Sequence, residues 1–148
     1  MKKYAYINGK IVDIRKPAVM TNDIGLLRGY GVFDFMRTYN GKIFHYGEHF
    51  SRFQNSAKML DLKVPLSKGK TEVLAKDLLK KNKAKEASIR LVLTGGPTDD
   101  GMVWTKPTFI ILVEDLYELP AKCYTAGAKL ITFDYQRLLP GSKNNNYI

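Results

Sequence analysis

Two Asn-Gly pairs, Asn8-Gly9 and Asn40-Gly41, constrain the fold of this sequence more than any other feature. Each pair stands between short runs of aromatic and β-branched residues, which favour strands. Asn-Gly in this setting predicts a tight hairpin turn, because both central residues of that turn adopt positive φ. We therefore expect one hairpin over residues 4–12. We also expect a strand over residues 32–39 that turns back into a short strand at residues 42–44.

Three helical segments are expected around these hairpins. Residues 21–30 predict a short helical turn that ends in a loop at Gly29 and Gly31. Residues 47–60 predict an amphipathic helix, because apolar side chains recur there at steps of three and four. These side chains are Phe50, Phe53, Ala57 and Leu60.

A third helix is expected over residues 67–83. Ser67 is a suitable N-cap, and the lysine-rich end suits the negative end of the helix dipole. On this helix we expect one apolar face, formed by Val73, Leu74 and Leu78.

Further strands are expected in the second half of the chain. Residues 87–93 and 108–113 are apolar and β-branched, and they flank a glycine-rich loop at residues 94–101. A connector follows at residues 118–125, and then a strand at residues 128–135. Hairpins, two main helices and then more strands, in that order, indicate the α+β class with a mainly antiparallel sheet.

Composition narrows the class of protein. An apolar share of 45% supports a packed core in a chain of 148 residues, for which one domain is the default. Its single cysteine, Cys123, excludes an intrachain disulfide and fits a reducing compartment. No apolar run approaches the roughly 20 residues of a membrane helix, and no apolar signal region follows Met1. We therefore expect a soluble, cytoplasmic protein with no membrane partner.

Several common site chemistries find weak support in these residues. His45 and His49 are four residues apart, but no further ligand pattern accompanies them, so we expect polar contacts at a helix start and no metal. The charge balance, 24 basic minus 14 acidic residues or +10, and the lysines between residues 63 and 85 suit a phosphate backbone. No nucleic-acid-binding signature goes with them, so a basic nucleic-acid-binding module remains a distant alternative.

The end of the chain carries a more specific pattern. Lys143 follows a Pro-Gly turn and precedes three asparagines and Tyr147. A lysine becomes a nucleophile when its surroundings favour the neutral amine. On physical grounds alone, an exposed turn lysine and a surface or ion-paired Arg52 are the simpler interpretations.

Taken together, four motifs in this order resemble the class IV pyridoxal-phosphate aminotransferases. The motifs are Gly31-Val32-Phe33-Asp34, Tyr39-Asn40-Gly41-Lys42-Ile43-Phe44, Glu48-His49-Phe50-Ser51-Arg52-Phe53 and Pro140-x-x-Lys143-x-x-Asn146-Tyr147. This family includes branched-chain aminotransferases, D-amino acid aminotransferases and aminodeoxychorismate lyases. Each motif alone is weak, whereas the ordered set is fairly specific.

The resemblance implies a role for particular residues. Lys143 falls on the family's lysine that holds pyridoxal 5'-phosphate as a Schiff base. The same lysine then shuttles the substrate α-proton. Arg52 falls on the arginine that grips the cofactor phosphate, and a guanidinium fork suits that group. Tyr147 matches an aromatic that contacts the cofactor. The substrate-side positions of the family fall on Phe33, Arg37, Arg28, Gly101 and Met102.

The resemblance also implies an organisation into domains. Residues 1–125 correspond to a small N-terminal α+β domain, and residues 126–148 to the start of a second domain that includes the cofactor lysine. Similar proteins take the acidic partner of the pyridine nitrogen from that second domain. We therefore expect the chain to be the front portion of something longer, and this portion alone to be inactive.

The reaction implied is amino transfer between an amino acid and a 2-oxo acid, by a homodimer. D-amino acid aminotransferases carry Arg and His in the loop after the long strand. Here Asp100 and Met102 occupy those places, so a branched-chain-like L-amino acid is preferred. The alternative within the family is an aminodeoxychorismate lyase that releases pyruvate.

Overall fold

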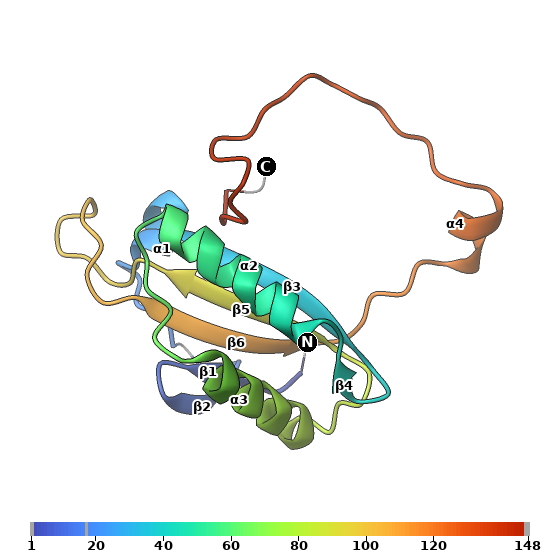
Figure 1. Cartoon of the computed structure of the whole chain (residues 1–148), viewed down its shortest axis with the longest axis horizontal. Helices are drawn as coiled ribbons and strands as arrows, with labels where there is room; N and C mark the ends of the chain where they lie inside the picture. The colour runs from blue at the N-terminus through green and yellow to red at the C-terminus, as the bar shows by residue number, and fades with distance from the viewer. Residues whose placement is uncertain (1, 17, 147–148) are drawn as a thin grey trace.

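The computed structural model describes residues 2–16 and 18–146, and Figure 1 shows their arrangement. Both predicted hairpins form: β1 (Tyr4–Ile7) pairs with β2 (Lys10–Asp13), and β3 (Gly31–Tyr39) pairs with β4 (Lys42–Ile43). The Asn and Gly residues of both turns have positive φ, between 43° and 93°. The turns therefore have the backbone conformation that the two Asn-Gly pairs predict.

Two longer-range strands complete the sheet. β5 (Ser88–Thr94) and β6 (Thr108–Glu114) lie at its centre, in the order β2-β1-β6-β5-β3-β4. Neighbouring strands in this order are antiparallel. The mainly antiparallel α+β class expected from the sequence is therefore confirmed.

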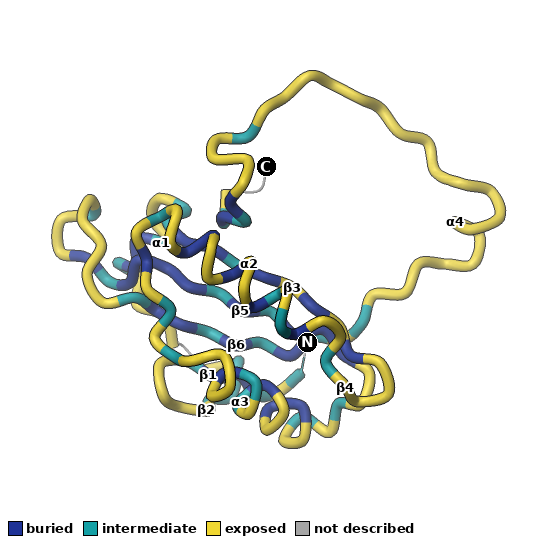
Figure 2. The backbone as a smooth tube through the Cα atoms, in the orientation of Figure 1, coloured by how far each residue is buried: buried dark blue, intermediate teal, exposed yellow. Residues whose placement is uncertain are grey.

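Two long helices cover one face of this sheet. α2 (Tyr46–Met59) and α3 (Lys68–Lys81) both lie on that face, and their inner sides are the buried ones (Figures 1 and 2). The largest fully buried side chains come from these helices and from the central strands; they include Phe50, Phe53, Phe109, Met36, Leu78, Ile89, Leu91 and Ile111. The core thus lies between the helices and the sheet, while the other face of the sheet carries half-exposed side chains.

The expected short helical turn is also present. α1 (Ile24–Arg28) begins after Asp23, whose side chain accepts a hydrogen bond from the Gly25 N–H at 2.8 Å. It ends at Gly29, which adopts φ 66° as a left-handed C-cap.

The predicted apolar face of α3 is partly wrong. Ser67 caps the helix as expected, and Leu78 is buried, but Val73 is 59% exposed. The face against the sheet is instead formed by Thr71, Ala75, Leu78 and Leu79. These positions follow the i, i+4, i+7, i+8 spacing of one helix face, and Val73, two residues after Thr71, lies on the opposite side. Two of the inward positions carry the small side chains of Thr71 and Ala75. A search for large apolar side chains therefore does not identify this face.

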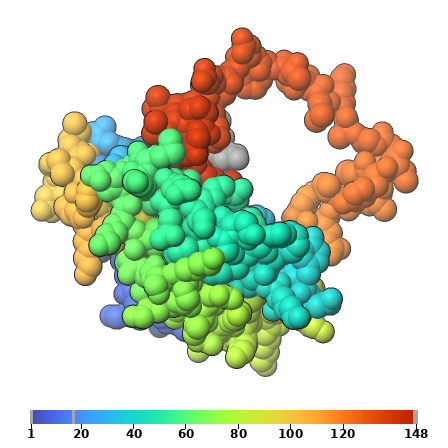
Figure 3. Space-filling view, viewed as in Figure 1, coloured from blue at the N-terminus to red at the C-terminus, as the bar shows by residue number. Residues whose placement is uncertain are grey.

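The predicted strand at residues 128–135 does not form. Residues 115–138, here called the arm, leave the end of β6 and swing away from the sheet (Figures 1 and 3). The arm contains one short helix, α4 (Ala121–Thr125), in the predicted connector. A strand needs a neighbour to complete its hydrogen bonds, and no described strand lies beside residues 128–135. Within the described residues no helix has the length and apolarity of a membrane span, and the longest have 14 residues.

Candidate active site

Lys143 lies in a segment that returns to the sheet after the arm. Residues 139–146, here called the lysine segment, run beside the start of β3, where Val32 and Asn144 form an antiparallel bridge. The Phe33 N–H donates a hydrogen bond to the Lys143 carbonyl oxygen at 2.9 Å. Because β4 pairs only with the far end of β3, the lysine segment takes the part of this edge that β4 leaves open.

Gly31 allows this close approach. The Asn145 N–H donates to the Gly31 carbonyl oxygen at 2.9 Å. A Cβ on residue 31 would lie 2.6 Å from the Asn145 side-chain nitrogen and 2.6 Å from the Leu93 carbonyl oxygen. Both distances are shorter than van der Waals contact, so a side chain at residue 31 would displace both the Asn145 side chain and the β5 backbone at Leu93.

The Lys143 residue is held from two sides. Its backbone N–H donates to the Ser56 hydroxyl on α2 at 3.0 Å, and its Nζ lies 4.2 Å from the centroid of the Phe33 ring. The second distance is within cation–π range. Lys143 is therefore half-buried against the sheet and α2. The interpretation as an exposed turn lysine is wrong, and Phe33 is the predicted substrate-side residue that lies next to the amine.

Arg52 lies one helical turn before Ser56, on the same side of α2. Its Nε and Nη2 atoms donate to the two carboxylate oxygens of Asp34, at 2.7 and 2.9 Å. Asp34 is fully buried in β3, whereas half of the Arg52 side chain is exposed. Lys143 is thus bonded to α2 at Ser56, one helical turn after Arg52.

The sequence interpretation missed the role of Asp34 and His49. The His49 Nδ1 lies 2.8 Å from an Asp34 carboxylate oxygen, while His45 faces Glu48 at 3.3 Å. These are polar contacts near a helix start, as predicted for the two histidines. Among the described residues, no group of three or more His, Cys, Asp or Glu side chains is placed to hold a metal ion. An aspartate within an apolar strand was the available signal, because a buried carboxylate requires partners.

Two buried polar atoms flank Lys143 without a hydrogen-bond partner in the part of the chain that the structure describes. They are the Ser142 hydroxyl oxygen and the Asn144 side-chain carbonyl oxygen. Buried polar groups are normally satisfied, so these two atoms indicate a place at the lysine segment where a polar ligand could bind. The Ser142 hydroxyl can donate or accept, and the Asn144 oxygen can accept.

The other predicted substrate-side residues divide into two groups. The Arg28 Nε donates to the Gly101 carbonyl oxygen, which brings α1 and the loop before Met102 together. Arg37 instead stacks on the Tyr39 ring, 4.0 Å from its centroid. It lies four residues along β3 from Phe33, or about 13 Å at the usual rise of a strand. Tyr147, the predicted cofactor aromatic, lies outside the described residues.

Asp100 organises the loop between β5 and β6. Its carboxylate accepts hydrogen bonds from the Val103 N–H, the Met102 N–H and the Thr98 hydroxyl. These bonds favour the charged form and lower the pKa of Asp100 to about 2. The Asp100 side chain is therefore occupied in holding this loop, and Met102 lies exposed beside it.

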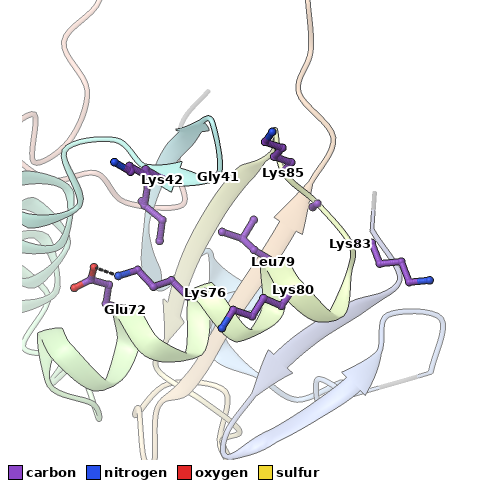
Figure 4. A pocket seen from close by; sticks show the side chains of 10 residues that line it. Gly41, Lys42, Glu72, Lys76, Leu79, Lys80, Lys83 and Lys85 are labelled. Carbon is purple, nitrogen blue, oxygen red and sulfur yellow. Dashed lines mark ion pairs between the residues drawn. The ribbon is translucent and has the colours of Figure 1, made fainter.

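A hollow lies away from Lys143, near the start of α2, between β4 and the second half of α3 (Figure 4). It encloses about 700 Å³ above Leu79, and five lysines line it. Lys76 pairs with Glu72 at 2.7 Å, and Figure 4 shows Lys83 and Lys85 pointing in different directions. Because these ammonium groups do not converge on one point, the hollow resembles a solvated basic face, and we place no chemistry there.

Comparison with known proteins gives a family match over the range that contains the four motifs. The model of the class IV amino-transferase family matches residues 31–148. A Methanocaldococcus jannaschii protein, provisionally named a branched-chain-amino-acid aminotransferase, is 35% identical over 97% of this chain and 51% of its own length. A D-alanine aminotransferase of Listeria monocytogenes is 34% identical over 61% of this chain and 31% of its own. The chain thus spans about half of the first relative, and less of the second.

Solved structures agree on the fold. The branched-chain amino acid aminotransferase of Escherichia coli superposes with a TM-score of 0.72 at 24% identity, over 83% of this chain and 43% of that one. A hypothetical aminotransferase of Mycobacterium tuberculosis, solved in a PLP-bound form, gives 0.66 at 23% identity, over 83% and 42%. With the family match over most of its length and a relative at 35% identity, the chain belongs to the class IV aminotransferases.

Proposed function

We propose that this chain forms the N-terminal part of an enzyme that uses pyridoxal 5'-phosphate to move an amino group between an amino acid and a 2-oxo acid. The observation that carries the proposal is that Lys143 is bonded to Ser56 on α2, one helical turn after Arg52, which is itself paired with Asp34 of β3. In this proposal residues 1–125 are one domain, and residues 126–148 begin a second one. The homodimer expected for the family, and a cytoplasmic location consistent with the single cysteine, remain part of it.

The residues present fit this cofactor. An amine, a guanidinium and an unsatisfied buried hydroxyl suit a ligand that carries an aldehyde and a phosphate. The guanidinium belongs to Arg52, and the hydroxyl to Ser142, the neighbour of Lys143. When bound, the cofactor supplies an electron sink that stabilises negative charge at the substrate Cα.

This chain's own residues would bind the aldehyde and the phosphate, carry the proton and exclude water. Lys143 would bind the aldehyde carbon through its Nζ, with release of water. Once the amine of the substrate has taken its place, the freed Lys143 amine would carry the proton that leaves or returns to the substrate Cα. Arg52 would hold the phosphate and so fix the distance between the phosphate end and the amine. Phe33, 4.2 Å from the Lys143 Nζ, would exclude water on one side of the amine.

A branched-chain L-amino acid is the preferred substrate. A relative 35% identical to this chain carries the branched-chain name, and an apolar Phe33 at the amine suits an apolar side chain. The D-alanine aminotransferase relative makes D-alanine the second candidate. D-alanine is less favoured because Asp100 occupies the place where D-specific members carry a cation. The Asp100 carboxylate is also already bonded within its own loop.

The test is an amino-transfer assay with the protein expressed from its complete gene. Leucine and D-alanine are each incubated with 2-oxoglutarate, and aminodeoxychorismate is tested separately for pyruvate release. We expect leucine-dependent glutamate formation that Lys143→Arg abolishes and Lys129→Arg, a change in the exposed arm, leaves intact. Pyruvate release alone would replace this proposal with the lyase, and full activity of Lys143→Arg would contradict the role of Lys143.

A further inference from the structure

Asp34 is an unusual residue to find in the interior of this sheet. It is fully buried on the face of β3 that α2 covers. Its carboxylate receives four polar contacts: two from Arg52, one from His49 and one from the Phe35 N–H at 2.8 Å. A buried carboxylate is tolerated only when it is paired in this way. The cluster of Asp34, His49 and Arg52 is therefore a built arrangement with a fixed geometry.

The pairing fixes the plane of the Arg52 guanidinium. Two parallel hydrogen bonds from Nε and Nη2 to one carboxylate determine its orientation, because both partners are planar. The Arg52 side chain is 52% exposed, whereas that of Asp34 is wholly buried in the sheet. A long, half-exposed side chain loses considerable conformational entropy when it is ordered. Asp34 therefore orders Arg52 before any ligand arrives.

His49 holds Asp34 from a second side. Its Nδ1 lies 2.8 Å from an Asp34 oxygen and 3.1 Å from the Arg52 Nη2. An ionised carboxylate can only accept, so the hydrogen-bond network assigns the proton to Nδ1, which donates to Asp34. The approach to Arg52 is then a packing contact. His49 and Arg52 stand three residues apart on α2, and both converge on Asp34.

We propose that Asp34 is a positioning residue that presets the Arg52 guanidinium for the phosphate of the cofactor, with His49 keeping Asp34 in place. This inference rests on the proposed function, in which Arg52 contacts the phosphate. It goes further by assigning ligand affinity to two residues that do not themselves contact the ligand. A purely structural ion pair would instead attach α2 to β3 and affect stability alone.

The test separates affinity for the phosphate from stability. The dissociation constants of pyridoxal 5'-phosphate and of pyridoxal, which lacks the phosphate, are measured by absorbance on the cofactor-free full-length protein. Their ratio reports the phosphate contact, and loss of folded protein does not change it. Arg52→Met should lower the ratio more than the other variants. Asp34→Asn, which keeps the shape but removes the charge, should lower the ratio on the order of tenfold, the range typical of residues that orient a ligand-holding side chain.

Two further variants keep the inference falsifiable. Thr38→Val is the matched control, because Thr38 is buried on the same face of β3 and bonds the Lys85 and Ala87 carbonyl oxygens, away from Arg52. It should leave the ratio unchanged. If Asp34→Asn does not fold, His49→Phe decides the question, with a fall of a few-fold expected on the same scale.

The outcomes distinguish this inference from the function on which it rests. A ratio that falls in Arg52→Met but not in Asp34→Asn, or not in His49→Phe where that variant decides, overturns the inference and leaves the proposed function standing. A ratio that Arg52→Met does not change overturns the phosphate contact itself, and the inference with it. A fall in Asp34→Asn that Thr38→Val reproduces also overturns it, since the effect would then be general loosening of the sheet.

Discussion

The body of the molecule, residues 2–114, and the arm, residues 115–138, use the same kinds of side chain with opposite results. In the body Phe53, Phe109 and Ile111 are fully buried, while in the arm Ile131 and Phe133 are 88% and 79% exposed. The difference lies in partners, because every body strand pairs with a neighbouring strand, and two long helices cover one face of the sheet. Strand-forming residues alone therefore do not make a strand.

The lysine segment belongs to the body in this comparison, although it follows the arm. It bonds β3 through two backbone hydrogen bonds and α2 through Ser56. The residue with the proposed chemistry is thus fixed by the sheet that carries Phe33 and by the helix that carries Arg52. Consequently, the comparison predicts that changes in the body and its docking contacts disturb the site, and that changes in the arm do not.

The largest expected effect is the loss of a body side chain. Phe53→Ala removes a ring that is fully buried between Phe50 and Phe109, at centroid distances of 6.5 and 6.0 Å. We expect a loss of about 3–5 kcal/mol in the free energy of unfolding, since such a change leaves a cavity in a packed core. Urea denaturation measures it. A loss below about 1 kcal/mol would show that α2 is not packed as described.

The features predicted from the sequence are the local ones. The Asn-Gly turns, the Ser67 cap and the Gly29 C-cap each depend on a few neighbouring residues, and all are present. The sheet order and the buried face of α3 depend on contacts between residues far apart in sequence. The periodicity of apolar residues therefore predicted the strands and the helix, but not the strand order or the complete buried face. Residues 128–135 have the composition of a strand, but their ladder partner would have to come from elsewhere.

In the candidate site, too, some residues could be named from local motifs and others only from contacts between distant elements. Lys143 and Arg52 could be named because their motifs resemble those of a known family. Asp34, His49 and Ser56 could not, because their roles arise only when β3, α2 and the lysine segment meet. The Asp34–Arg52 ion pair, for example, joins residues on different elements, and no spacing rule predicts it.

The next effect concerns the attachment of the lysine segment to the body. Ser56→Ala removes the acceptor of the Lys143 N–H, a loss of about 1 kcal/mol for one hydrogen bond. Hydrogen exchange at the Lys143 amide should accelerate about fivefold, which corresponds to that free energy. Ser51→Ala, in an exposed position of the same helix, is the control and should leave this exchange rate unchanged. Equal rates in both variants would mean that Ser56 does not hold the segment.

The arm should respond far less. Phe133→Ser in the 148-residue chain should change the free energy of unfolding by less than about 0.5 kcal/mol, as expected for an exposed side chain. The same change in the protein expressed from its complete gene gives a sharper comparison. A larger loss there would indicate that further chain covers the arm, whereas a large loss in the shorter chain would contradict its exposure.

The smallest effect is a pH dependence in the loop between β5 and β6. The pKa of Asp100 is lowered to about 2 by hydrogen bonds from Val103, Met102 and Thr98. The order that this carboxylate gives the loop is therefore complete above about pH 4, and it is lost as the pH falls towards 2. Fluorescence of Trp104, the single tryptophan, follows the change. Asp100→Asn should lack this transition, and identical pH profiles of the two proteins would refute it.

The central claim is that the Lys143 amine binds the cofactor aldehyde, and chemical trapping tests it most directly. The protein expressed from its complete gene is incubated with pyridoxal 5'-phosphate, reduced with borohydride and digested for mass mapping. The account predicts a phosphopyridoxyl group on the peptide that contains Lys143, and its disappearance in Lys143→Ala. Labelling that is unchanged in Lys143→Ala, or that maps to other lysines, would contradict it.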